Sequence, residues 1–287
     1  MDFLIEPLQY GFMQRSLIVA VVVGIICAVV GTYLMVQRLA LLGDAISHSV
    51  LPGLAIAFIF DWNIFTGAFI AGLLSTILIN VIRNNSQIKE DAAMGIVFSA
   101  FFALGITLIT VVQKDNKIDL NHFLFGNILS VSVTEVRDTI AIALFILFIV
   151  ILFYKELLFY TFDKLGAQSV GLPVYWLDFS LMILIGLTIV ASLKAVGVIL
   201  VLSLLITPSA TAYLLVTRLH QVMLVGVLVG VVSSISGMYI SFYYNIPSGP
   251  AIVLVATFLF FLSFLFSPSQ GIFTNLFKPK LNNIVNN

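Results

Sequence analysis

Asp44 and His48 are the residues of this 287-residue chain whose types and spacing most clearly point to chemistry. They lie four positions apart, so on a helix both side chains project from one face with Cβ atoms about 5–6 Å apart. A carboxylate and an imidazole together suit a divalent first-row transition metal. An apolar run follows directly, and a charged group at the bilayer centre costs about 2.5–3.5 kcal/mol, so such groups usually face a cavity and a partner. The pair is therefore a candidate metal site or proton path.

A structural role for the same pair is an alternative. Asp44 would cap a helix that starts at Ala45 by accepting backbone N–H bonds, and His48 would hydrogen-bond to Asp44. Ser47 and Ser49 add polar surface, which favours a water-lined face, although serine also bonds back to its own helix. Spacing alone leaves both roles open.

The two remaining histidines have weaker claims. His122 lies close to Asp115 and Asp119 near an expected outer boundary, where it is either a weak entry ligand for a metal or a solvated loop residue. His220 follows Arg218 in an expected inner loop, which predicts a position at the membrane interface.

The composition indicates what kind of element must position these residues. Hydrophobic residues make up 61% of the chain and charged residues 9%, against about 45–50% and about 25% in soluble proteins. Too few charges are available to cover a soluble surface. Thirteen Lys and Arg balance thirteen Asp and Glu, so a nucleic-acid partner is excluded, and the single cysteine excludes a disulfide framework. The chain is predicted to be an all-α, polytopic membrane protein in contact with lipid.

Sequence motifs for enzymatic chemistry are missing from the chain. The phosphate-loop pattern G-x-x-x-x-G-K-[ST], the zinc-protease pattern H-E-x-x-H and the nucleophile elbow G-x-S-x-G do not occur. We therefore expect a conduit without catalytic residues of its own.

Runs without Asp, Glu, Lys or Arg repeatedly reach the roughly 20 residues that a membrane helix needs. Eight or nine such helices are expected, in a single transmembrane domain over residues 1–287. A short interfacial helix is expected at residues 7–14, within an N-terminal segment of about residues 1–15, and a cytoplasmic tail at about residues 278–287. The runs cover residues 16–37, 45–60, 62–82, 92–113, 139–154, 179–193, 195–217 and 219–277, the last holding two spans around a turn at 244–250.

The distribution of Lys and Arg predicts the orientation. With nine spans and an outer amino terminus, the inner loops hold eight basic residues and the outer loops five. Residues 155–173 then form a cytoplasmic loop. The inner set is Arg38, Arg83, Lys89, Lys155, Lys164, Arg218, Lys278 and Lys280, and the outer set is Arg15, Lys114, Lys117, Arg137 and Lys194.

That loop carries the signals of a short helix. Asp163 is a candidate N-cap, and Gly171 followed by Pro173 is a candidate stop. The helix is either a docking point for a cytoplasmic partner or an ordinary loop helix. Elsewhere, Gly226, Gly230 and Ser234 stand four residues apart, a spacing that lets membrane helices pack closely.

Four segments together resemble the permease subunits of the zinc/manganese/iron family of bacterial ABC importers. They occur in the family's order and cover nearly the whole chain. They are residues 41–53 (LLGDAISHSVLPG), residues 196–201 (VGVILV) with 205–212 (LITPSATA), residues 162–173 (FDKLGAQSVGLP) and residues 246–250 (IPSGP).

The resemblance implies a type II ABC-importer-like fold in the bacterial inner membrane. It implies a homodimer that works with cytoplasmic ATP-binding subunits and an extracellular metal-binding lipoprotein or periplasmic protein. Asp44 and His48 correspond to the family's metal-pathway residues. The coupling helix corresponds to Asp163, Lys164, Leu165, Gly166, Ala167, Gln168, Ser169, Val170 and Gly171.

On this resemblance the chain carries Mn²⁺, Zn²⁺ or Fe²⁺ by alternating access, binds no permanent cofactor and leaves ATP hydrolysis to its partner. Three other functions stay open. An ion-coupled secondary metal transporter also uses intramembrane Asp and His. A membrane scaffold would use the pair only as a structural bond, and a metal-chelate importer would need no direct ion ligands.

Overall fold

The structure is a computed structural model that describes residues 5–112, 128–267 and 271, with the side chain of Lys194 left out. Within those ranges the chain is helical and contains no strand. The elements are η1 (Glu6–Gln9), α2 (Gly11–Val36), α3 (Ala40–Ser49), α4 (Leu51–Ile59), α5 (Ile64–Asn85), α6 (Glu90–Val112), η2 (Ile128–Ser130), α8 (Val133–Leu152), α9 (Tyr154–Phe162), α10 (Lys164–Ser169), α11 (Val174–Val196), α12 (Val198–Leu215), α13 (Leu219–Tyr244) and α14 (Ser248–Phe266).

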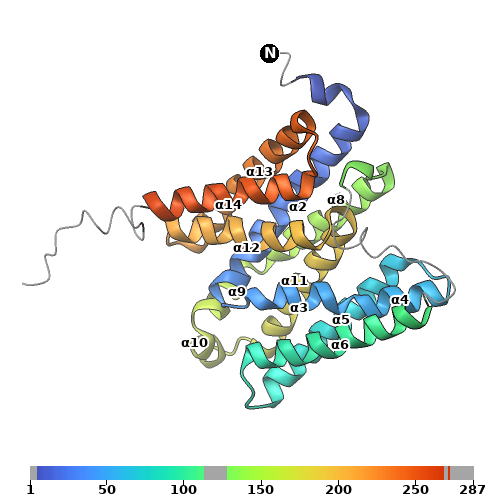
Figure 1. Cartoon of the computed structure of the whole chain (residues 1–287). Helices are drawn as coiled ribbons and strands as arrows, with labels where there is room; N and C mark the ends of the chain where they lie inside the picture. Colours follow the sequence, from blue (N-terminus) through green and yellow to red (C-terminus); the bar gives the residue numbers. More distant parts are fainter. Residues whose placement is uncertain (1–4, 113–127, 268–270, 272–287) are drawn as a thin grey trace, which may run out of the picture.

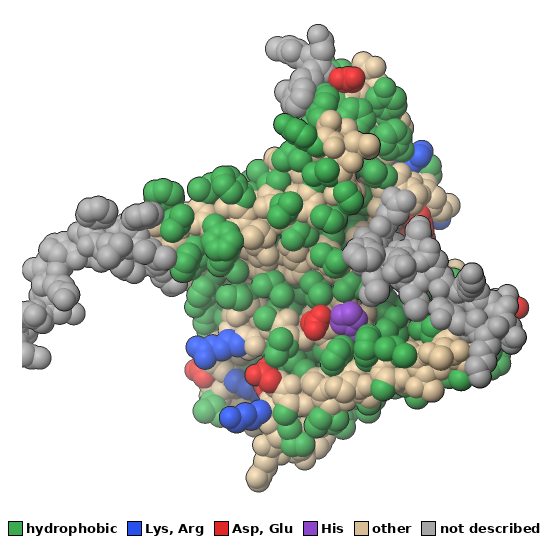
Figure 2. Space-filling view, in the orientation of Figure 1, with side chains coloured by type: hydrophobic (Ala, Val, Ile, Leu, Met, Phe, Trp, Pro, Cys, Tyr) green, Lys and Arg blue, Asp and Glu red, His purple; other side chains and the backbone are tan. Residues whose placement is uncertain are grey.

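Eight of the described helical segments are long and apolar enough to cross a membrane, with α3 and α4 together forming one of them. A ninth span results if α8 and α9, which meet at a bend of 68°, are counted together. The predicted all-α membrane bundle of eight or nine spans is confirmed. In Figure 2 the visible surface is mostly hydrophobic, and several charged side chains gather at its lower left.

The helices form two groups around α2 and α11 (Figure 1). In one group α2 packs against α12 and α13, and α14 packs on both of these. In the other group α3 and α4 pack against α5 and α6. Helix α11 contacts α2, α3, α5, α8 and α9, so it connects the groups. The helix that carries Asp44 and His48 therefore belongs to the second group.

Small residues bring α2 and α13 close together, as their spacing predicts. A Cβ atom on Gly230 would lie 2.9 Å from the carbonyl oxygen of Gly24. The hydroxyl of Ser234 donates a hydrogen bond of 3.0 Å to the carbonyl oxygen of Ala20. Such contacts replace the hydrophobic driving force that helices lack in lipid.

The N-terminal segment differs from the prediction. Residues 7–14 do not form one interfacial helix, because η1 ends at Gln9 and the long helix α2 already begins at Gly11. Tyr10 between them is extended, with φ −90° and ψ 120°. Pro7 suits the start of the short η1 turn because its φ is fixed and it lacks an N–H.

The segment 155–173 also differs from the expected loop. It contains two helices, α9 and α10, and only α10 was predicted. The predicted turn at 244–250 is confirmed: α13 ends at Tyr244, its C-cap Asn245 is left-handed at φ 52°, and α14 starts at Ser248. The predicted tail at 278–287 lies outside the described residues.

Candidate functional site

Helix α3 positions Asp44 and His48 on one exposed stripe. The helix begins at Ala40 after the N-cap residue Leu39, so Asp44 stands in its second turn. The capping alternative for Asp44 is therefore wrong. The side chains of Asp44 and His48 are 53% and 25% exposed, whereas Ile46 between them is fully buried.

The break between α3 and α4 follows directly after this stripe. Pro52 stands at the start of α4 and has no N–H, so it cannot donate the helical hydrogen bond to the carbonyl of His48. Together the two short helices still form one apolar segment of 20 residues, Ala40–Ile59. The candidate pair thus lies in the first half of an interrupted span.

The imidazole of His48 is held by two aromatic rings of α6. Its ring centroid lies 5.6 Å from that of Phe98 and 5.6 Å from that of Phe102, with both contacts edge-on. The two phenyl rings stack on each other at 5.6 Å. Nδ1 of His48 is buried and has no hydrogen-bond partner among the described residues, so Nε2 is the nitrogen that faces Asp44.

The geometry of the pair suits a shared metal ion. His48 Nε2 and Asp44 Oδ1 are 3.5 Å apart. Two ligand atoms at about 2.0–2.2 Å from one tetrahedral ion are separated by about 3.4 Å, so the observed spacing allows both atoms to bind the same ion. Within the described part of the chain, no group of three or more His, Cys, Asp or Glu residues is placed to hold a metal. The described part of the chain therefore brings two candidate ligands together here.

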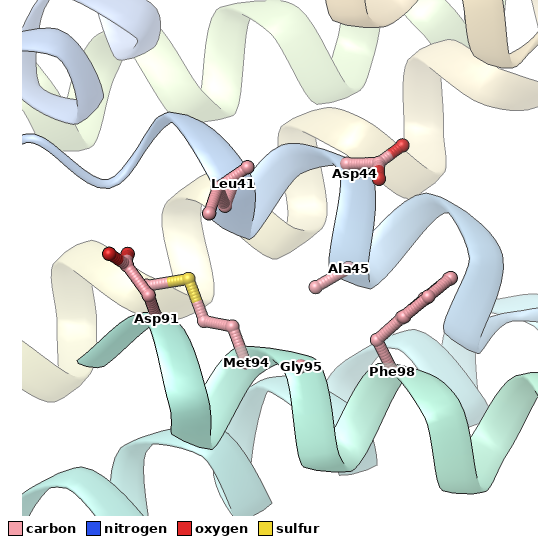
Figure 3. Close-up of a pocket in the computed structure, with 7 residues that line it drawn as sticks. All are labelled: Leu41, Asp44, Ala45, Asp91, Met94, Gly95 and Phe98. Atoms are coloured by element: carbon pink, nitrogen blue, oxygen red, sulfur yellow. The ribbon is translucent and has the colours of Figure 1, made fainter. Parts of the chain in front are cut away.

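A pocket of about 110 Å³ opens beside the pair, between α3 and α6 (Figure 3). Asp44 contributes to its wall from α3, and Asp91 and Met94 from α6. The complete lining is Leu41, Asp44, Ala45, Asp91, Met94, Gly95 and Phe98.

The neighbouring serines do not extend the polar stripe. Ser47 and Ser49 are buried, at 1% and 0% exposure. Ser49 donates its hydroxyl to the carbonyl oxygen of Ala45 over 2.6 Å, which is the bond back to the helix considered as its alternative. The expectation of a water-lined serine face is wrong, because four-residue spacing places Asp44 and His48, and not the serines, on the exposed side.

Helix α10 forms where the sequence predicts it. Asp163 caps it by accepting a hydrogen bond of 2.7 Å from the backbone N–H of Gly166. After its last turn Gly171 takes a left-handed φ of 86°. Leu165 and Val170 are 79% and 71% exposed, so the helix presents apolar side chains outward.

The remaining candidates do not join the site. His122, Asp115 and Asp119 lie outside the described residues. His220 stands in the first turn of α13, two residues after its N-cap Arg218, on a different element from the pair.

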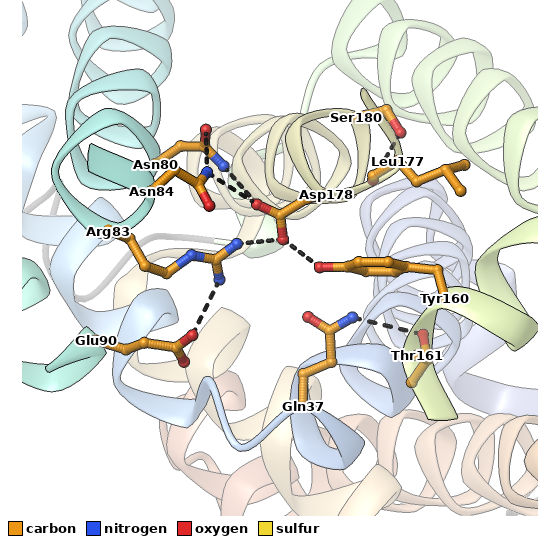
Figure 4. Close-up of polar contacts among 10 residues, drawn as sticks. All are labelled: Gln37, Asn80, Arg83, Asn84, Glu90, Tyr160, Thr161, Leu177, Asp178 and Ser180. Carbon is orange, nitrogen blue, oxygen red and sulfur yellow. Dashed lines mark hydrogen bonds and ion pairs between the residues drawn. The ribbon is translucent and has the colours of Figure 1, made fainter. Parts of the chain in front are cut away.

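A buried polar cluster went unrecognised in the sequence (Figure 4). Asp178 of α11 pairs with Arg83 of α5 and accepts a hydrogen bond from the hydroxyl of Tyr160 of α9. The available signal was an aspartate within the apolar stretch 174–193, since intramembrane ionisable residues need partners. Its partners are too distant in the sequence for spacing to identify them.

This fold defines a multi-pass membrane protein, and comparison with known proteins gives its family. The family model described as "ABC 3 transport family" matches residues 9–267. The manganese transport system membrane protein MntC of Halalkalibacterium halodurans is 47% identical over 278 residues, covering 97% of this chain and 95% of the relative. The chelated iron transport system membrane protein YfeD of Yersinia pestis is 42% identical over 262 residues, covering 91% of this chain and 88% of the relative.

A solved structure agrees with these sequence relatives. PsaBC from Streptococcus pneumoniae, determined in complex with a Fab, matches with a TM-score of 0.82 and 41% identity. The match covers 94% of this chain and 96% of that one. This chain belongs to the ABC 3 transport family and is a multi-pass membrane permease of the ABC transporter class. The predicted family is confirmed.

Proposed function

We propose that this chain is the membrane-spanning subunit through which an ATP-driven importer passes Mn²⁺, Zn²⁺ or Fe²⁺ into the bacterial cytoplasm. The observation that carries the proposal is the pair Asp44–His48, whose facing atoms are 3.5 Å apart on the exposed stripe of α3. Manganese is the first candidate, because MntC of H. halodurans and ScaB of Streptococcus gordonii are named for manganese. Iron is the second candidate, because YfeD of Yersinia pestis is named for chelated iron transport.

The pathway is completed by a second copy of the chain. Two protomers related by a two-fold axis bring two aspartates and two histidines around one ion. These supply up to four ligands, and two negative charges offset the divalent cation where water screens poorly. The two ligands of a single protomer support this arrangement, because a transition-metal site commonly uses four or more. The shared site must bind the ion weakly enough to release it again.

The energy comes from a separate subunit. Cytoplasmic ATP-binding subunits dock on α10, the coupling helix formed by residues 163–171, and an extracellular metal-binding protein delivers the ion. The exposed Leu165 and Val170 support docking at α10. Closure of the ATP-binding subunits then moves the permease between outward-open and inward-open states. The orientation predicted from Lys and Arg supports this docking, because it would put α10 and the loop after α5 on the cytoplasmic side.

ATP-dependent uptake of radiolabelled Mn²⁺, Zn²⁺ and Fe²⁺ into proteoliposomes tests the proposal. The vesicles contain the permease, its ATP-binding subunit and the metal-binding protein. The wild-type complex should import at least one ion, whereas Asp44→Ala and His48→Ala should abolish uptake and leave assembly intact. His220→Ala and Asp61→Asn are matched controls of the same residue types away from the pair.

Three outcomes contradict the proposal. Normal uptake by Asp44→Ala and His48→Ala removes the pathway assignment. Uptake without the ATP-binding subunit, driven by an ion gradient, indicates a secondary transporter. Uptake of a metal chelate that is insensitive to Asp44→Ala indicates a chelate importer.

A further inference from the structure

The polar cluster around Asp178 joins three helices, α5, α9 and α11 (Figure 4). One carboxylate oxygen, Oδ1, contacts Arg83 and accepts from the Tyr160 hydroxyl. The other, Oδ2, accepts from the side-chain amides of Asn80 at 2.9 Å and Asn84 at 3.2 Å. Both oxygens of the carboxylate are thus satisfied, by donors from α5 and α9.

Close packing of these helices does not by itself require buried charged residues. The side chains of Asp178 and Arg83 are only 2% and 7% exposed. A buried ion pair repays its desolvation only when its geometry is good, and apolar residues of similar size often stabilise a protein as well. Ionisable residues inside membrane spans usually mark functional positions. A role beyond stability is therefore expected.

The cluster connects α10 with the helices that lie beside the candidate metal site. Asp163 both ends α9 and caps α10, so no linker separates Tyr160 from the coupling helix. On the α5 side of the cluster, Nη1 of Arg83 lies 3.7 Å from Oε1 of Glu90, which stands in the first turn of α6. Further along, α6 holds Phe98 and Phe102, which contact the ring of His48.

These contacts form a continuous path from α10 through α9, Asp178 and α5 to α6. We infer that Asp178, Arg83 and Tyr160 mechanically link α10 to α5 and α6. When α10 moves, this link moves the other two helices, so that ATP hydrolysis is coupled to the site at His48. These three are positioning residues: they do not touch the ion. The inference rests on the proposed function, because it assigns α10 to the docked ATP-binding subunit.

A conservative variant separates coupling from stability. Tyr160→Phe removes one hydroxyl, which is a donor to Asp178, and leaves the ring in place. Hydrogen bonds to charged groups are stronger than those between neutral groups. Because this bond would hold the link between α9 and α11 together, its loss should lower the amount of metal imported per ATP by about tenfold. Tyr175→Phe, on an exposed tyrosine of α11, is the matched control. Asp178→Asn is the second test variant, because it keeps the shape and removes the charge.

The experiment measures three quantities on the assembled complex in proteoliposomes. They are Mn²⁺ imported per ATP hydrolysed, basal ATP hydrolysis and the thermal midpoint. We expect Tyr160→Phe to assemble, to keep its basal hydrolysis and to import far less Mn²⁺ per ATP, while Tyr175→Phe matches the wild type. A purely structural cluster would lower the thermal midpoint and leave the ratio unchanged.

An unchanged ratio of Mn²⁺ to ATP in Tyr160→Phe overturns the inference, whatever happens to the thermal midpoint. If Asp178→Asn fails to assemble, Tyr160→Phe decides alone. A wild-type complex that hydrolyses ATP but imports no divalent metal contradicts the proposed function itself. Wild-type import with an unchanged Tyr160→Phe ratio contradicts only the coupling role.

Discussion

Asp44 and His48 differ in how firmly the protein holds them. Asp44 is more than half exposed, whereas the imidazole of His48 is packed edge-on against Phe98 and Phe102. A ligand ring that is already oriented loses less freedom when the ion binds. The proposed site thus combines a preoriented imidazole with a more exposed carboxylate that has room to adjust.

This difference predicts a role for the phenyl rings. Phe102→Leu should raise the Mn²⁺ concentration for half-maximal uptake by about tenfold, because residues that orient a metal ligand typically contribute that much to affinity. Concentration-dependent uptake in proteoliposomes measures the change. Phe258→Leu, on an exposed ring of α14, should leave it unaltered. Equal half-maximal concentrations for Phe102→Leu and the wild type would show that the rings do not orient His48.

At the residue scale, spacing predicts some contacts and misses others. The pair Asp44–His48 was predictable because four-residue spacing places two side chains together on any helix. The contacts of Asp178 were not predictable, because Arg83 and Tyr160 lie on other helices and meet it only through tertiary packing. The pairing of distant helices leaves no trace in a local pattern.

At the scale of the elements, the short helix α10 exposes Leu165 to 79%, and its C-cap residue Val170 is exposed to 71%. Leu165→Asp should prevent the ATP-binding subunit from co-purifying with the permease, because a charge at an apolar contact must be desolvated without a partner. Val133→Asp is the control, because it places the same charge on another exposed apolar position, at the start of α8. Retention of the subunit by Leu165→Asp would rule out docking at this surface.

Close backbone contact between α4 and α5 depends on two glycines. A Cβ atom at Gly53 would collide with the carbonyl oxygen of Gly67. Gly53→Ala should lower the free energy of unfolding by about 1–3 kcal/mol, as overpacking does in other cores. Thermal unfolding in detergent measures this loss. Gly95→Ala is the control, because a Cβ atom there meets nothing within 4 Å, and a stable Gly53→Ala would show that the helices can separate.

The elements themselves were largely predictable from charge-free runs and turn residues. The exceptions follow from local chemistry. The bend of 68° between α8 and α9 occurs at Phe153, without a glycine or proline to indicate it. The start of α2 at Gly11 lies ahead of Arg15, so a search for charge-free runs begins the helix too late.

At the scale of the whole molecule, the proposed metal site is incomplete in a single chain. One chain presents a carboxylate oxygen and an imidazole nitrogen 3.5 Å apart, and in the proposed function a second copy completes the shell. The same two-fold arrangement would place two Asp178 clusters and two α10 helices in the complex. Movement of both coupling helices would then reach one shared ion.

Spectroscopy of bound Mn²⁺ tests this claim most directly. The purified permease is saturated with Mn²⁺, the ions per chain are counted, and nitrogen modulation is recorded in the electron spin echo. A site shared by two chains should hold one ion for two chains, with histidine nitrogen modulation that persists in His220→Ala and disappears in His48→Ala. One ion in every chain, or a nitrogen signal that survives in His48→Ala, would contradict it.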